Sequence, residues 1–216
     1  MRNNSVSLIS RYVLALLLAM SSVAYVSSIQ IRQAPSRVEA AEEQEPEHAH
    51  GFLIADTKAV AAGKKFRLGV ELKMDPQWHT YYRESGDAGM PTRITWELPP
   101  GFKASDLMWE KPHKLVDAGI TTYGYNNRTV ISADIQTPAN LKAGEKLNFK
   151  AKVKWLVCKD ACIPGGAELE LTLPVAASPA EAVAANEDKF KNVNFNGPAS
   201  EIKADGADAS SGQKKK

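Results

Sequence analysis

The chain has 216 residues, of which 24% are charged, and its formal net charge is +2 at pH 7. Arg2 and Arg11 are the only charged residues among the first 24, so removal of that segment would bring the formal charge from +2 to 0. Proteins that bind nucleic acid carry clustered positive charge. The composition therefore argues against a nucleic-acid partner.

The N-terminus predicts export. Arg2 and Arg11 precede the apolar run "YVLALLLAMSSVAYV", and Ser22-Val23-Ala24 offers small residues of the kind that signal peptidase cleaves. The uncharged stretch continues to Ile31, which is long enough to span a membrane. Residues 1–28 are therefore predicted to be a signal peptide or an N-terminal anchor, and both interpretations export the rest of the chain.

Residues 29–50 are predicted to be a linker. The stretch "QAPSRVEAAEEQEPEHAH" is rich in Pro, Ala and Glu and has no apolar periodicity, so it cannot bury a core. His48 and His50 could bind a metal ion weakly, but no third ligand lies nearby in the sequence. We therefore expect both histidines to be solvated.

Residues 51–175 are predicted to form one β-rich domain. In "FRLGVELKM" and "LNFKAKVKWLV", apolar residues alternate with polar or small ones, a period of two that buries one face of a strand. Trp155 then belongs to the core, and the lysines form a solvated face. "AELELTLPV" repeats the pattern, and shorter runs around "FLIAD", "RITWEL", "LMWEK" and "RTVISADI" fit further strands. About seven short strands without intervening helices predict an all-β antiparallel sandwich.

Both cysteines lie between the two clearest strands, in "WLVCKDACIPGG". We expect "CKDACIPGG" to be the hairpin connection, stiffened by Pro164. The spacing differs from the C-x-x-C of thioredoxin-type sites. A bridge between Cys158 and Cys162 would enclose few residues and stabilise the fold little, yet exported proteins often carry inert disulfides. Position and loop size alone leave a redox pair and a structural bridge equally open.

Residues 176–216 are predicted to contain a short helix and a disordered tail. Ser178 would cap the helix, with Pro179 in its first turn and Glu181 closing a capping box. From Asn192 onward the chain has almost no large apolar residue, which predicts a tail without a fixed structure.

Three segments together resemble a known family: "WHTYYRESGDAGMPTRITWELPPGF", "GITTYGYNNRTV" and "VKWLVCKDACIPGGAELELTLPV". They are similar to the periplasmic N-terminal domain of the thiol:disulfide interchange protein DsbD and its ScsB-like relatives, from about Phe52 to Val175. The resemblance implies a periplasmic domain with an immunoglobulin-like antiparallel β-sandwich fold. We expect this domain to be a monomer.

The resemblance also implies an electron relay without a cofactor or metal. Cys158 and Cys162 would receive reducing equivalents from a transmembrane thiol reductant of the DsbD or CcdA-like type and pass them to periplasmic thioredoxin-like proteins. Cys162 would bond to the partners and Cys158 would resolve the mixed disulfide. An aromatic cap shields the pair in the family, and the matching loop "TTYGY" makes Tyr123 the candidate cap, with Tyr125 behind it.

Two other interpretations compete with the relay. Two thiolates suit copper(I), so the chain could be a copper carrier in which His79 or His113 completes the site. The chain could also be a secreted sandwich with a purely structural disulfide. His79 itself is expected to be a hydrogen-bonded structural residue, because disulfide exchange does not require a histidine.

Overall fold

The computed structural model describes residues 47–202. The predicted signal peptide or anchor, most of the predicted linker and the last part of the predicted tail lie outside these residues. Between residues 47 and 202, no helix is long and apolar enough to cross a membrane.

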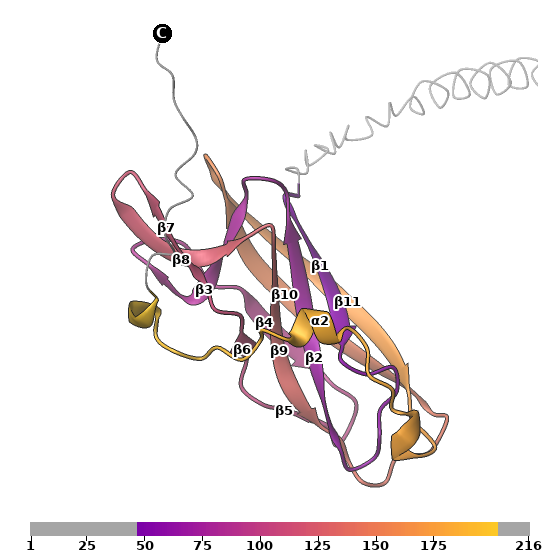
Figure 1. The fold of residues 1–216 in the computed structure, drawn as a ribbon. Helices are drawn as coiled ribbons and strands as arrows, with labels where there is room; N and C mark the ends of the chain where they lie inside the picture. Colours follow the sequence, from indigo (N-terminus) through magenta and orange to yellow (C-terminus); the bar gives the residue numbers. More distant parts are fainter. Residues whose placement is uncertain (1–46, 203–216) are drawn as a thin grey trace, which may run out of the picture. The chain divides into compact units, whose positions relative to one another are not determined.

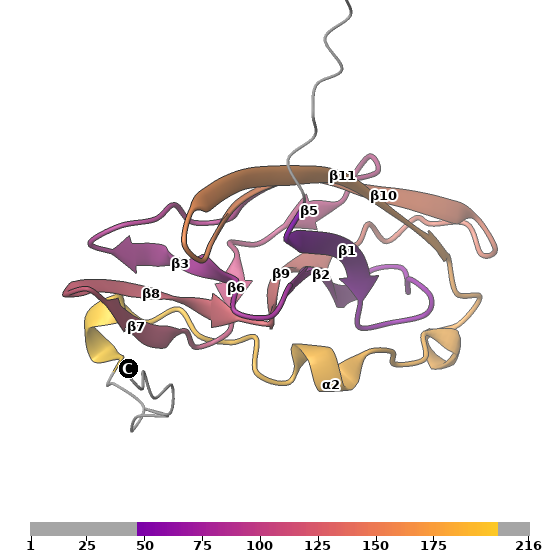
Figure 2. The ribbon, with the colours of Figure 1, turned by 90° about the horizontal axis from the view of Figure 1, so that it is seen from above.

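Two antiparallel sheets face each other across the core (Figures 1 and 2). The first sheet has the order β1-β2-β9-β5, with β6 also paired to β9. Its strands are β1 (Ala49–Ala55), β2 (Lys65–Met74), β5 (Lys103–Ala104), β6 (Met108–Trp109) and β9 (Arg128–Gln136). The second sheet has the order β11-β10-β3-β8-β7, with β4 paired to β10. Its strands are β3 (His79–Gly86), β4 (Arg93–Glu97), β7 (His113–Asp117), β8 (Ile120–Asn126), β10 (Lys146–Cys158) and β11 (Cys162–Pro174).

The core is built from the alternating apolar positions of the longest strands. In β2 the side chains of Leu68, Val70 and Leu72 are fully buried, and Phe149 and Val153 in β10 are buried against them. Trp155 lies in the same core, as predicted. The antiparallel β-sandwich predicted from the alternation is therefore confirmed.

The β10–β11 hairpin is longer than predicted. Its ladder runs without interruption from Lys146 opposite Pro174 to Cys158 opposite Cys162, so only residues 159–161 form the loop. The sequence "IPGG" was expected in the connection but lies in β11. Pro164 is tolerated there because β11 pairs with β10 alone and is an edge strand of its sheet.

The second sheet consists of two halves that meet at the cysteines. One half contains β4, β10 and β11, and the other contains β3, β7 and β8. Between them a single registered pair joins Cys158 of β10 to His79 of β3. Beside this pair, the hydroxyl of Thr80 donates a hydrogen bond to the carbonyl oxygen of Leu156 at 3.1 Å. The disulfide thus sits where the two halves of the sheet are joined.

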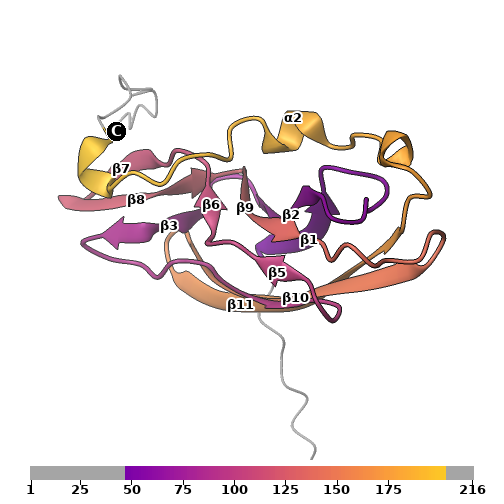
Figure 3. The same ribbon diagram turned by 90° about the horizontal axis from the view of Figure 1, so that it is seen from below.

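The C-terminal segment, residues 176–202, lies along the outer side of the first sheet at α2 and continues to the second sheet at its end (Figures 2 and 3). It contains the short helices η1 (Pro179–Glu181), α2 (Glu187–Phe190) and η2 (Ala199–Glu201). The predicted helix is only the single turn η1, in which Ser178 makes no side-chain capping bond. The prediction of a tail from Asn192 is wrong up to Ile202, because Val193, Ala199 and Ile202 are buried.

A buried charge network attaches α2 to the first sheet. Glu71 of β2 is only 2% exposed, and its carboxylate accepts hydrogen bonds from Lys189 Nζ at 2.7 Å and Arg128 Nε at 2.9 Å. Phe190 packs beside Gly69, where a Cβ atom would approach the ring to 2.8 Å. The Glu71 carboxylate and the space above Gly69 therefore both hold this short helix against the sheet.

The domain begins earlier than predicted, because β1 includes Ala49 and His50. His48 is not solvated as expected: its ring stacks on Trp78 with centroids 3.8 Å apart, and its Nδ1 lies 3.0 Å from Asp75 Oδ2. His50 is exposed, in agreement with the prediction. This packing could not be predicted from local sequence, because Trp78 is distant from His48 along the chain.

Candidate redox site

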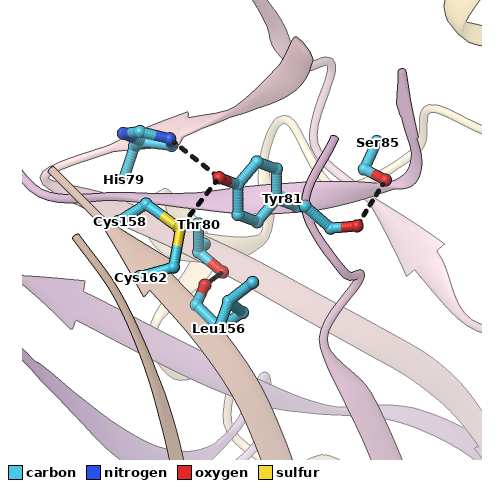
Figure 4. The surroundings of a disulfide bond; sticks show 8 residues. His79, Thr80, Tyr81, Ser85, Leu156, Cys158 and Cys162 are labelled. Carbon is cyan, nitrogen blue, oxygen red and sulfur yellow. Dashed lines mark hydrogen bonds between the residues drawn. A yellow bond between two sulfur atoms is a disulfide. The ribbon is translucent and has the colours of Figure 1, made fainter. Parts of the chain in front are cut away.

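Cys158 and Cys162 form a disulfide at the tip of the β10–β11 hairpin, with their Cα atoms 4.1 Å apart (Figure 4). The two residues are directly opposite in the ladder, which brings their Cα atoms as close as a bridge requires. Their surroundings differ: Cys158 is 3% exposed, whereas Cys162 is exposed. An external thiolate can therefore approach Cys162 more readily than Cys158.

Tyr81 of β3 places a polar group beside the sulfur of Cys162. Its hydroxyl lies 3.9 Å from Cys162 Sγ and 3.2 Å from Nε2 of His79 (Figure 4). The ring of Tyr81 is almost fully buried, and this burial raises the pKa of its phenol above the ordinary value. The phenol therefore keeps its proton at neutral pH and can donate it in a hydrogen bond.

His79 can accept that hydrogen bond. Burial lowers the pKa of its imidazole, and the charge of Asp117 opposes this shift only in part. A neutral imidazole at pH 7 has one nitrogen free to accept from the phenol. The expectation that His79 is a hydrogen-bonded residue is consistent with this geometry, but its partner is a residue of the redox site.

The Gly-Asp-Ala-Gly motif holds Tyr81 in place. Gly89 has a φ of 89°, and any Cβ atom there would collide with the Tyr81 ring. The loop is tied to β8 by Asp87, whose backbone N–H donates to Thr121 O and whose carboxylate accepts from Thr121 N, both at 2.9 Å. The hydroxyl of Ser85 donates to Gly89 O at 3.2 Å. The glycine allows the loop to lie directly against the aromatic ring.

The two tyrosines predicted to cap the disulfide lie on β8. The hydroxyl of Tyr125 is buried and donates to Glu110 O at 2.7 Å, and burial raises its pKa. Tyr123 is partly buried and packs beside Gly86. Their shielding role stays a prediction, whereas Tyr81 is the aromatic residue that contacts Cys162. Sequence reasoning missed Tyr81, although the alternation in "HTY" puts it on the same face of its strand as His79.

No group of three or more His, Cys, Asp or Glu side chains in residues 47–202 is arranged to hold a metal ion. His79, one of the histidines considered for a copper site, is engaged with Tyr81.

Comparison with known proteins places this chain in a family. The model described as "Thiol:disulfide interchange protein DsbD, N-terminal" matches residues 51–174, more than half of the chain. No curated protein matches the sequence.

Two of the similar solved structures are the N-terminal domains of ScsB and DsbD. The N-terminal periplasmic domain of ScsB from Proteus mirabilis has a TM-score of 0.48 and 21% identity, covering 68% of this chain and 55% of that chain. The reduced N-terminal domain of DsbD from Neisseria meningitidis has a TM-score of 0.35 and 10% identity, covering 56% of this chain and 86% of that chain. The chain thus spans just over half the length of the ScsB structure.

The matched residues include both cysteines and nearly all of the two sheets. The chain therefore belongs to the family of DsbD N-terminal domains, which are thiol–disulfide exchange domains with an immunoglobulin-like β-sandwich fold.

Proposed function

We propose that this chain is an exported, periplasmic exchange domain that relays reducing equivalents through Cys158 and Cys162. It takes them from a transmembrane thiol reductant and passes them to periplasmic thioredoxin-like proteins. The observation that carries the proposal is the unequal exposure of the two cysteines, Cys158 being buried and Cys162 exposed.

The position of the bridge argues against a purely structural role. Cys158 and Cys162 are already aligned by a ladder of 13 registered pairs, and the bridge encloses only residues 159–161. Closing so short a loop removes little entropy from the unfolded chain. The disulfide therefore adds little to an alignment that the strands already provide. Exchange with a partner, by contrast, requires an accessible cysteine, and Cys162 at the hairpin tip is exposed.

Reduction of the domain follows from this asymmetry. A thiolate of the membrane reductant attacks Sγ of Cys162, the bond to Cys158 breaks, and Cys158 leaves with the electron pair. The second thiolate of the reductant then attacks the sulfur of the reductant's first cysteine, which is bonded to Cys162. This closes the reductant's disulfide and releases Cys162 as a thiolate. The Tyr81 phenol can then donate its hydrogen bond to this thiolate instead of to His79, which stabilises the reduced form.

Delivery uses the same two sulfurs in the opposite order. The Cys162 thiolate attacks the disulfide of a thioredoxin-like protein, which releases one of that protein's sulfurs. Cys158 then attacks Sγ of Cys162, re-forms the internal bond and releases the partner in its dithiol form. Cys158 needs to reach only Cys162, so its burial is compatible with a resolving role.

Trapping tests this assignment. Cys158→Ala removes the resolving thiol, so a mixed disulfide between Cys162 and an exported thioredoxin-like protein should accumulate and appear as a reducible band on a gel. Cys162→Ala is the matched control and should form no such band. A band with Cys162→Ala alone would reverse the roles of the cysteines, and a band with neither variant would count against the relay.

A further inference from the structure

We propose that residues 195–202, here called the strap, form a positioning element of the redox site. The strap lies outside the residues that match the family model. It holds the middle of β3 and thereby keeps Tyr81 against Cys162. The inference rests on the proposed exchange function, because it concerns the reactivity of the same sulfur.

The strap contacts β3 where the pairing of β3 with β8 is interrupted. The register between β3 and β8 jumps from Tyr81 opposite Gly124 to Gly86 opposite Thr122, so the residues between Tyr81 and Gly86 form a large bulge. A bulge leaves backbone groups outside the ladder and weakens the local constraint on the strand. Residues 82–85 must therefore be held by something other than β8.

Three consecutive residues of this bulge bond to the strap. The hydroxyl of Tyr82 donates to Gly197 O at 2.7 Å, and the guanidinium of Arg83 donates to Asn196 O at 2.7 Å. The carboxylate of Glu84 accepts from the backbone N–H of Ala199 at 2.9 Å. The strap thus bonds to three of the four residues that the ladder omits.

The contact is also a packed one. Tyr82 is fully buried, with its ring centroid 5.5 Å from that of Trp109 and 5.8 Å from that of Phe195. The backbone N–H of Phe195 donates to Trp109 O at 2.8 Å, which anchors the strap to β6. Ala199 and Ile202 join the main core. Movement of the bulge therefore requires the strap to leave its place.

Two connections carry this constraint to the sulfur. Tyr81 directly precedes Tyr82 and faces the disulfide. The other end of the bulge continues into the loop whose Gly89 lies against the Tyr81 ring. A looser bulge would thus free both the backbone of Tyr81 and the loop that covers its ring, and the hydroxyl would lose its position beside Cys162.

Thiol alkylation at several pH values tests the strap in the full-length Cys158→Ala protein. Tyr82→Phe removes the bond to Gly197 and keeps the buried ring. We expect it to lower the thiolate fraction of Cys162 near neutral pH by about threefold, since a net hydrogen bond is worth roughly three- to tenfold and only part of it is lost. Thr137→Val is the control, because it also removes a buried hydroxyl, one that donates to Ala61 O and Lys64 O. Thr137 directly follows β9 and has no bond to the strap or to β3.

The effect should pass through Tyr81. In a Tyr81→Phe background, Tyr82→Phe should change the alkylation profile no further, because coupled residues are not additive. An unchanged profile for Tyr82→Phe, an equal change for Thr137→Val, or an equal effect in the Tyr81→Phe background would each overturn the inference. Alkylation needs no partner protein, so failure of the relay itself would appear separately, as the absence of a trapped mixed disulfide.

Discussion

The phenol of Tyr81 lies close enough to Cys162 to influence the chemistry of its sulfur. Disulfide exchange depends on the thiolate fraction of the attacking cysteine and on the access of its partner. A protonated phenol beside the sulfur stabilises a thiolate by a hydrogen bond, and burial of Tyr81 keeps the phenol protonated. Tyr81 therefore favours the reactive form of the sulfur without carrying a charge.

The Tyr81→Phe substitution isolates this contribution. In the Cys158→Ala protein it should raise the pKa of the Cys162 thiol and slow alkylation near pH 7 by about three- to tenfold, because one hydrogen bond to the thiolate is lost. Tyr125→Phe also removes a buried hydroxyl, one that bonds to Glu110 O, and should leave the profile unchanged. Superimposable pH profiles for wild-type and Tyr81→Phe protein would remove Tyr81 from the mechanism.

The cysteine pair could be predicted from the sequence, but its neighbours could not. Cys158 and Cys162 are the only cysteines of the chain, and their place between two alternating strands predicts a hairpin tip. Tyr81 reaches Cys162 only because His79 pairs with Cys158, and this pairing joins residues far apart in the sequence. Local periodicity describes which face a residue occupies and carries no information on which strand lies beside it.

At the scale of elements, the β10–β11 hairpin is held mainly by its ladder and its buried side chains. The double variant Cys158→Ala/Cys162→Ala should therefore remain a folded sandwich. Closing a loop of about five residues contributes only about 2 kcal/mol in the chain-entropy model, so the free energy of unfolding should fall by that amount or less. Urea unfolding followed by circular dichroism measures the change, and loss of the sheet signal at room temperature would favour a structural bridge.

The attachment of α2 should depend on pH through Glu71. Burial would raise the pKa of this carboxyl, but the hydrogen bonds from Lys189 and Arg128 outweigh burial and hold the pKa below its ordinary value. A carboxyl whose pKa is lower in the folded state stabilises the protein above its unfolded pKa of about 4.3. This contribution should be lost as the pH falls below that value through the folded pKa.

Glu71→Gln tests the network at neutral pH. The variant leaves Lys189 and Arg128 without their shared carboxylate, so the free energy of unfolding should fall by about 1–3 kcal/mol at pH 7. The difference from the wild type should shrink in acid, where Glu71 is protonated in both states. Glu170→Gln is a suitable control, because that carboxylate pairs with Lys150 at the exposed face and should matter little. Equal stability of wild-type and Glu71→Gln protein at pH 7 would contradict this role.

At the scale of the whole molecule, the packing of residues 176–202 is the part of the fold that the sequence did not predict. The sandwich follows from a period of two repeated over long strands, which is a strong local signal. The C-terminal segment has no such period, and its few apolar residues, among them Phe190, Val193 and Phe195, fill separate places on a surface made elsewhere in the chain. These residues are buried by strands that lie elsewhere in the sequence, so their burial cannot be predicted from the segment itself.

The arrangement of the whole domain presents the exposed Cys162 at the tip of the β10–β11 hairpin. The reduction potential of the Cys158–Cys162 pair, measured by equilibration in glutathione buffers of known composition, tests the relay most directly. A domain that accepts and donates reducing equivalents should have a potential in the range of the exchange proteins, about −120 to −270 mV. A potential below about −300 mV would mark an inert structural disulfide and contradict the account.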